Sequence, residues 1–196
     1  MTLTLDPHLW WYISRATGIV AWLMLTASVL WGVVLATDLF PNWRRNATIL
    51  TMHRWLAGLT FFFIAGHLGT LLLDSYAHFR PVDLVVPYAS TWRPTAVAVG
   101  VIALWCLVAV EVTALGAKKL SKSWWRVVHI ASYFVFWGVS VHAALAGTDA
   151  SKTLYIVTAF AALAAVAFAA SYRALSHHLP KRKPARVARA QGRAGA

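Results

Sequence analysis

Four histidines lie inside long apolar stretches of the sequence, and they form two pairs. His53 and His67 are fourteen residues apart on one stretch, and His129 and His142 are thirteen apart on another. Ionisable side chains inside a membrane span are costly, so they are rare and usually functional. At about 1.5 Å rise per residue, the members of each pair lie roughly 20 Å apart along a helix. Two neighbouring helices would therefore place His53 opposite His129 near one membrane face, and His67 opposite His142 near the other.

This arrangement suits iron porphyrins better than a single metal ion. A b-type haem iron takes one neutral imidazole on each axial side, so each haem needs one histidine from each of two facing helices. Ligands roughly 20 Å apart cannot share one coordination shell, whose bonds are about 2 Å long. We therefore predict two haem b groups, one ligated by His53 and His129 (the inner pair) and one by His67 and His142 (the outer pair). A proton relay, or histidines hydrogen-bonded between helices, are the alternatives.

The thirteen-residue interval between His129 and His142 poses a geometric problem. Fourteen residues at 3.6 per turn return to within about 40° of the starting face, which suits the other helix. Thirteen residues miss by about 140°, so a straight helix would aim His129 and His142 in different directions. Because Gly138 lies between them, we predict an irregularity or bend of this helix between Tyr133 and Val141.

The composition fits one helical membrane bundle. Of 196 residues, 60% are hydrophobic and 12% are charged, which is too apolar for an ordinary soluble domain. We predict an all-α membrane protein of five transmembrane helices, each long enough to cross about 30 Å of hydrocarbon. The membrane domain would cover residues 9–176, and residues 177–196 would be a disordered basic cytoplasmic tail. The predicted spans are Leu9–Ala36, Thr48–Leu73, Pro94–Leu115, Ser123–Ala146 and Thr153–Leu175.

The basic residues set the predicted orientation. Fourteen of the eighteen Lys and Arg residues lie in or beside three segments, whereas Arg15, Arg80, Arg93 and Lys152 lie towards the other face. By the positive-inside rule, the N-terminus lies outside the plasma membrane and the C-terminus in the cytoplasm. A net charge of +12 could suggest nucleic acid, but topology accounts for it, so no nucleic-acid partner is predicted. The three segments are Asp38–Arg54, Gly116–Arg126 and Arg173–Ala196.

Three arginines are candidates to bind the carboxylates of haem propionates, because Arg pairs well with carboxylates. Arg54 follows His53 directly and Arg126 lies three residues before His129, so both are candidates at the inner pair. Ordinary anchoring at the membrane surface explains these two equally well. Arg15 lies more than one turn inside the first span, a costly place for an unpaired cation. We expect it to face the outer haem propionates or an electron acceptor.

The histidine spacings resemble those of the ferric reductase-like transmembrane domain superfamily. This superfamily includes eukaryotic ferric reductases, NADPH oxidases and the haem subunit of the bacterial periplasmic methionine sulfoxide reductase system. The resemblance covers nearly all of Leu9–Ala170, accounts for the thirteen-residue interval, and points to the stand-alone bacterial branch. It implies a di-haem cytochrome b that carries electrons from the cytoplasmic to the outer face. The fragments that carry it are SRATGIVAW (14–22), HRWLAGL (53–59), WWRVVHIASY (124–133) and HAALAGTD (142–149).

The electron donor and acceptor are expected to be other molecules. The sequence has no Gly-rich dinucleotide fingerprint, so we predict no flavin or nicotinamide site in it. The donor would then be a cytoplasmic-side flavoprotein reductase or a quinol. The resemblance implies ferric iron, oxygen or an extracytoplasmic redox protein as the acceptor. Two classes stay open: an oxidoreductase that reduces its acceptor at the outer haem, and a relay subunit that passes electrons to a separate extracytoplasmic redox enzyme.

Overall fold

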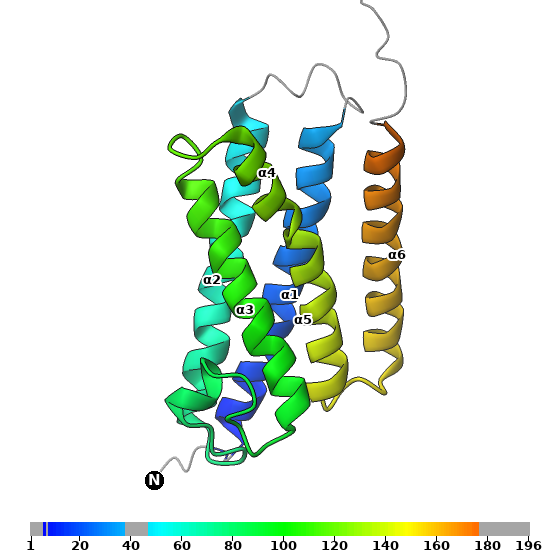
Figure 1. Ribbon diagram of the computed structural model, residues 1–196. Helices are drawn as coiled ribbons and strands as arrows, with labels where there is room; N and C mark the ends of the chain where they lie inside the picture. Colours follow the sequence, from blue (N-terminus) through cyan, green and yellow to red (C-terminus); the bar gives the residue numbers. More distant parts are fainter. Residues whose placement is uncertain (1–5, 7, 38–46, 177–196) are drawn as a thin grey trace, which may run out of the picture.

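The structure is a computed structural model that describes residue 6 and residues 8–37 and 47–176. All regular structure in these residues is helical, and five segments are long and apolar enough to cross a membrane. The five predicted spans are therefore confirmed, whereas the predicted tail, residues 177–196, lies outside the described residues. The helices, which run along one another as a bundle (Figure 1), are α1 (Leu9–Ala36), α2 (Ala47–Leu73), the 3-10 helix η1 (Pro81–Leu84), α3 (Pro94–Leu115), α4 (Lys122–Ile130), α5 (Ser132–Ala146) and α6 (Thr153–Ser176).

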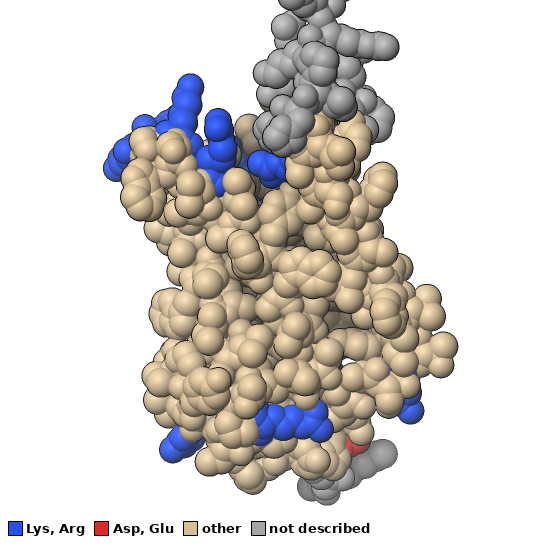
Figure 2. Space-filling model, turned by 45° about the vertical axis from the view of Figure 1, so that its right-hand side comes forward, with Lys and Arg blue, Asp and Glu red and all other residues tan. Residues whose placement is uncertain are grey.

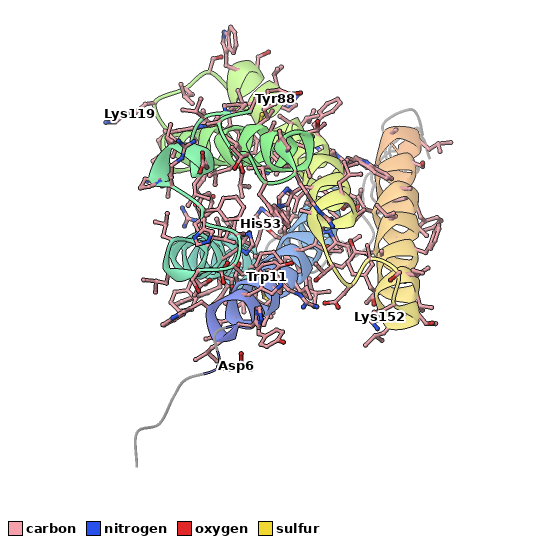
Figure 3. All side chains as sticks on the ribbon, turned by 90° about the horizontal axis from the view of Figure 1, so that it is seen from below. Asp6, Trp11, His53, Tyr88, Lys119 and Lys152 are labelled. Atoms are coloured by element: carbon pink, nitrogen blue, oxygen red, sulfur yellow. The ribbon has the colours of Figure 1, made fainter. Side chains whose placement is uncertain are left out.

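The bundle is built from two helix pairs. α1 packs along α2, and α3 packs along α5. α1 also contacts α5 and α6, so it joins the two pairs and holds α6 at the edge of the bundle. Seen along the bundle, His53 lies near the centre of the view, among α1, α2, α3 and α5 (Figure 3). The surfaces on which the two helix pairs meet are therefore the ones that carry the histidines.

Local sequence signals explain several helix ends. Pro94 occupies the first turn of α3, where its missing N–H has no helical partner to lose. Ser121 caps α4, because its hydroxyl oxygen accepts a hydrogen bond from the Trp124 N–H at 3.3 Å. These two ends fix where the third and fourth spans begin.

The fourth span is broken at Ala131. α4 ends at Ile130 and α5 begins at Ser132. The Ala131 N–H donates to the Val128 carbonyl at 3.0 Å, a tighter turn than that of an α-helix. The direction of the chain changes between α4 and α5 (Figure 1). His129 and His142 therefore lie on two helical segments with different axes.

The predicted irregularity of this span is present, but its predicted position was wrong. The interval from Tyr133 to Val141 is continuous α-helix. Gly138, which we expected to host the distortion, instead faces α3: a methyl group added there would lie 3.4 Å from the Ala103 side chain. Gly138 thus serves close packing of α5 on α3, and the break lies closer to His129.

A hydrophobic core fills the middle of the bundle between the levels of the two histidine pairs. Its most deeply buried members are Val135 and Phe136 of α5 and Val166 of α6, with 1%, 0% and 0% of their surface exposed. The indole N–H of Trp22 donates to the Ser140 hydroxyl at 3.0 Å, which satisfies the donor inside this apolar region. The two sites are therefore separated by packed side chains.

The long connection between α2 and α3 folds back onto the bundle. Phe79 and Leu84 are buried in a second cluster with residues of α1, α2 and α3. The indole N–H of Trp105 donates to the Val85 carbonyl at 2.9 Å, which fixes the loop against the side of α3. Arg80 and Asp83 form an ion pair of 2.7 Å, and hydrogen bonds from the Arg80 side chain hold the pKa of Asp83 below its usual value. The loop thus covers the bundle on the side of the outer pair.

Charged side chains mark the two ends of the molecule. On the face shown in Figure 2, Lys and Arg side chains gather at both ends and leave an uncharged band between them. Such a band is what a bilayer requires of the surface that it covers. The protein is accordingly a multi-pass membrane protein.

Candidate functional site

The inner pair is brought together from two helices. The imidazole rings of His53 on α2 and His129 on α4 have their centroids 6.1 Å apart and their planes at 74°. The two helices are distant in sequence, so only the fold makes them neighbours. This is the pairing that the histidine spacing predicted.

The outer pair lines a cavity. His67 of α2 and His142 of α5 are both on the wall of a cavity of about 200 Å³, together with Arg15 of α1 and Asp149 of the α5–α6 connection. The remaining wall is mostly apolar. The bundle therefore joins each of the two predicted pairs at its own level.

The outer imidazoles are held by backbone carbonyls. The His67 Nδ1 lies 2.8 Å from the Ser14 carbonyl oxygen, and the His142 Nδ1 lies 2.7 Å from the Ala96 carbonyl oxygen. A carbonyl oxygen only accepts hydrogen bonds, so Nδ1 must carry the proton and donate in both cases. In a neutral imidazole this leaves the Nε2 lone pair available to bind a metal.

A glycine four residues after each carbonyl makes these hydrogen bonds possible. A helical side chain lies over the turn before its own Cα, so the residue at i+4 covers the carbonyl of residue i. Gly18 follows Ser14 by four residues, and Gly100 follows Ala96 by four. A methyl group on Gly18 would lie 3.0 Å from the His67 Nδ1, and one on Gly100 would lie 2.6 Å from the Nδ1 of the other outer histidine. We call each carbonyl with its glycine a glycine notch.

The same pattern recurs on α1 at the level of the inner pair. Ser28 and Gly32 are again four residues apart, and both lie fourteen residues after the first notch, which matches the spacing of the α2 histidines. The His53 Nδ1 lies 3.4 Å from the Ser28 hydroxyl oxygen, and a methyl group on Gly32 would lie 3.4 Å from the His53 Cε1. Our sequence analysis missed these glycines. A Ser-x-x-x-Gly pattern repeated at the histidine interval was the signal that could have found them.

His129 has no such notch. Its ring stacks on the Trp125 indole, with centroids 4.9 Å apart and planes at 15°. Within the described residues, the His129 Nδ1 and the Trp125 Nε1 are buried and have no hydrogen-bond partner. The inner site therefore keeps two unsatisfied polar atoms side by side.

The arginines fall into two groups. Arg15 lines the outer cavity and forms an ion pair with Asp149. Arg54 and Arg126, the candidates at the inner pair, have exposed side chains. Arg173 of α6, which the sequence analysis did not select, is partly buried, and its guanidinium donates to the Tyr133 hydroxyl oxygen at 3.4 Å. Its position inside the last predicted span was the signal that we overlooked.

The residues present fit a haem at each level. Each site offers two imidazoles from facing helices, the axial donor set of a b-type iron whose other ligands belong to the porphyrin. The part of the chain that the structure describes contains no group of three or more His, Cys, Asp or Glu side chains placed to hold a bare metal ion. At the outer level the fit is strongest, because both imidazoles are fixed and face one cavity.

Comparison with known proteins gives one finding. The family model described as ferric reductase like transmembrane component matches residues 17–140. The match includes His53, His67 and His129 and ends two residues before His142. No curated protein and no solved structure matches the chain.

Proposed function

The chain belongs to the family of ferric reductase like transmembrane components, and from that premise we propose that it is a membrane cytochrome with two b haems. It would carry electrons from the cytoplasmic to the outer face, with a flavoprotein reductase or a quinol as donor. Ferric iron, oxygen or an extracytoplasmic redox protein would be the acceptor. The proposed orientation follows from the distribution of Lys and Arg.

One observation carries this proposal: His67 and His142 lie on the wall of one cavity, and the Nδ1 atom of each is committed to a backbone carbonyl. A hydrogen bond that served only to join helices would set no requirement on the second ring nitrogen. Here the carbonyls fix the tautomer and the ring orientation of both histidines, and both rings, with Nε2 left free, lie on the wall of one cavity, as a pair of metal ligands requires. The inner pair, with ring centroids 6.1 Å apart, supplies a second bis-imidazole set.

The chain's own residues would bind, orient and enclose the haems. A b haem held between two imidazoles supplies one-electron redox chemistry at its iron. His53 and His129 would hold one haem, and His67 and His142 the other. The core between the sites, centred on Phe136, keeps water out of the middle of the bundle, and the α2–α3 loop covers it on the outer-pair side.

Arg15 is the arginine best placed to hold a propionate of the outer haem. It is the cation on the wall of the cavity that contains His67 and His142, and its ion pair with Asp149 keeps the guanidinium there. Arg54 and Arg126, the sequence-based candidates at the inner level, have exposed side chains that would have to turn inward to reach a propionate.

A reduced-minus-oxidised spectrum of the purified protein, with haem quantified per chain, tests the proposal. We expect two low-spin b haems in the wild type. His67→Ala and His129→Ala should each lose one haem, because each removes one of the two imidazoles that would hold a haem, at a different site.

His78→Asn is the matched control. His78 lies in the α2–α3 loop with φ 50°, a left-handed conformation that asparagine tolerates, so the loop should keep its shape. This variant should keep both haems. A wild type without haem, or a haem content that is the same in all four proteins, would overturn the proposal.

A further inference from the structure

The inner site holds a polar group that the two axial histidines do not explain. The Trp125 Nε1 is buried in α4 and has no hydrogen-bond partner among the described residues. An indole N–H can only donate, so its missing partner must be an acceptor. Leaving such a donor unpaired is costly, so an acceptor at this position would stabilise the folded protein.

A cation of α6 lies at this end of the bundle. Arg173, in the last turn of α6, is partly buried and close enough to His129 to interact with it electrostatically. Its guanidinium carbon lies 6.0 Å from the centre of the Tyr133 ring, and it donates to the Tyr133 hydroxyl oxygen at 3.4 Å. Within the described residues no carboxylate forms an ion pair with Arg173. A cation inside a span is expected to have an anionic partner.

Trp125 and the residue that positions Arg173 flank His129 in the sequence. Trp125 stacks directly on His129, and Tyr133, which positions Arg173, lies four residues after His129 on the other side of the break at Ala131. Trp125 is in the first turns of α4 and Arg173 in the last turn of α6, so both belong to the same end of the bundle. An acceptor held there would lie near the membrane surface, where a charged group is tolerated best.

We propose that Trp125 and Arg173 form a carboxylate-binding site beside His129, and that the carboxylate is a propionate of the inner haem. This inference rests on the proposed function and deepens it, because it assigns the inner haem's anion site to α6. It replaces the sequence-based candidates Arg54 and Arg126, whose side chains are exposed. Trp125 would donate one hydrogen bond, and Arg173 would supply the balancing charge while Tyr133 holds it in place.

The test measures how fast the inner haem leaves the protein. The full chain carrying His67→Ala holds only the inner haem, and its loss to excess apomyoglobin can be followed by absorbance. In this background Arg173→Gln should speed haem loss about tenfold, because a charge-assisted hydrogen bond is lost. Trp125→Phe keeps an aromatic ring beside His129 and removes the N–H together with part of the indole, so it should speed haem loss about threefold. Arg173→Lys should fall between wild type and Arg173→Gln.

Haem dimethyl ester, in which both propionates are blocked, separates a propionate site from a structural role. With this haem, Arg173→Gln should change the rate less than about twofold, because the esters carry no charge for the guanidinium to balance, and the effect of Trp125→Phe should shrink, because an ester carbonyl is a weaker acceptor than a carboxylate. Lys122→Gln removes an exposed charge at the same end of the bundle and should change neither rate. Equal acceleration with both haems would overturn the inference and indicate a structural role or another carboxylate. Unchanged rates with native haem would overturn it too, while a wild type that binds no haem would instead remove the proposed function on which it rests.

Discussion

The outer and inner histidine pairs differ in how the protein holds them. At the outer pair, both imidazoles donate from Nδ1 to backbone carbonyls at 2.8 and 2.7 Å, each through a glycine notch. At the inner pair, His53 lies 3.4 Å from a serine hydroxyl, and the Nδ1 of His129 is buried without a partner in the described residues. Backbone carbonyls therefore satisfy the Nδ1 atoms of both outer histidines, whereas the inner pair still has a buried polar atom without a hydrogen-bond partner in the described residues.

The difference originates in α3. This helix has a notch at Ala96 and Gly100, but thirteen residues after Gly100 it carries Thr113. The Thr113 hydroxyl donates to the Ala109 carbonyl at 2.8 Å, so its side chain covers the carbonyl that a glycine at this position would expose. α1, in contrast, repeats its notch at the interval of the α2 histidines. Hydrogen bonds to α1 hold the imidazoles of His53 and His67, and one to α3 holds that of His142. The orientation of His129 depends instead on its stacking with Trp125.

The largest effect is expected at Gly100. A methyl group there would lie 2.6 Å from the His142 Nδ1 and 2.8 Å from its Cε1, so Gly100→Ala must displace the imidazole. We expect the haem content to fall from about two to about one per chain, with the outer haem lost. Gly58→Ala, where an added methyl meets nothing within 4 Å, is the control and should keep both haems. Full haem content in Gly100→Ala would break the comparison.

Two variants of α1, Gly18→Ala and Gly32→Ala, compare the outer and inner sites within a single helix. Gly18→Ala places a methyl 3.0 Å from the His67 Nδ1, whereas Gly32→Ala places one 3.4 Å from the His53 Cε1, an ordinary contact. Overpacking costs about 1–3 kcal/mol, so Gly18→Ala should speed loss of the outer haem about tenfold. Gly32→Ala should change loss of the inner haem less than about twofold. The haem-transfer assay measures both rates, and equal sensitivity of the two glycines would contradict the difference between the sites.

The smallest effect concerns the loop on the outer-pair side. The Arg80 side chain lowers the pKa of Asp83, so the ionised carboxylate stabilises the folded loop. A lowered pKa contributes stability that is complete above the unfolded value of about 3.9 and is lost as pH falls through the folded value. The protection factors of the amides in residues 80–89, which correct for the intrinsic pH dependence of exchange, should therefore fall below about pH 4 in the wild type.

Asp83→Asn should exchange faster at neutral pH and lose this acid dependence. The effect should be modest, because 62% of the Arg80 side chain is exposed to solvent, which screens the pair. An acid dependence that persists in Asp83→Asn would assign it to another group. The haem content should not change in Asp83→Asn, because Asp83 is not one of the four histidines proposed to hold the haems.

Particular residues explain what the sequence could and could not predict. The four histidines were identifiable because ionisable side chains stand out in apolar spans, and their spacing alone predicted which ones meet. The position of the break at Ala131 could not be predicted because alanine favours helix, so nothing in the local sequence marks it. The importance of Gly18, Gly32 and Gly100 depends on which helices are adjacent. The position of Arg173 inside the last predicted span marked it as a candidate, but its neighbours depend on the rotation of α6 about its own axis, which the sequence does not show.

The division of the bundle into two helix pairs has consequences for the assembly of the protein in the membrane and for its degradation. The α1–α2 pair leaves the ribosome before α3 to α5. The ligands of both haems are divided between these two parts of the bundle, so each haem would join them at its own level. Without haem, the two parts would be joined only by protein contacts such as those of the central core, so the folded chain would be less stable and would be degraded faster. We expect the half-life of the protein in a pulse–chase experiment to shorten when haem synthesis is limited, and His67→Ala with His129→Ala to make that half-life independent of haem supply.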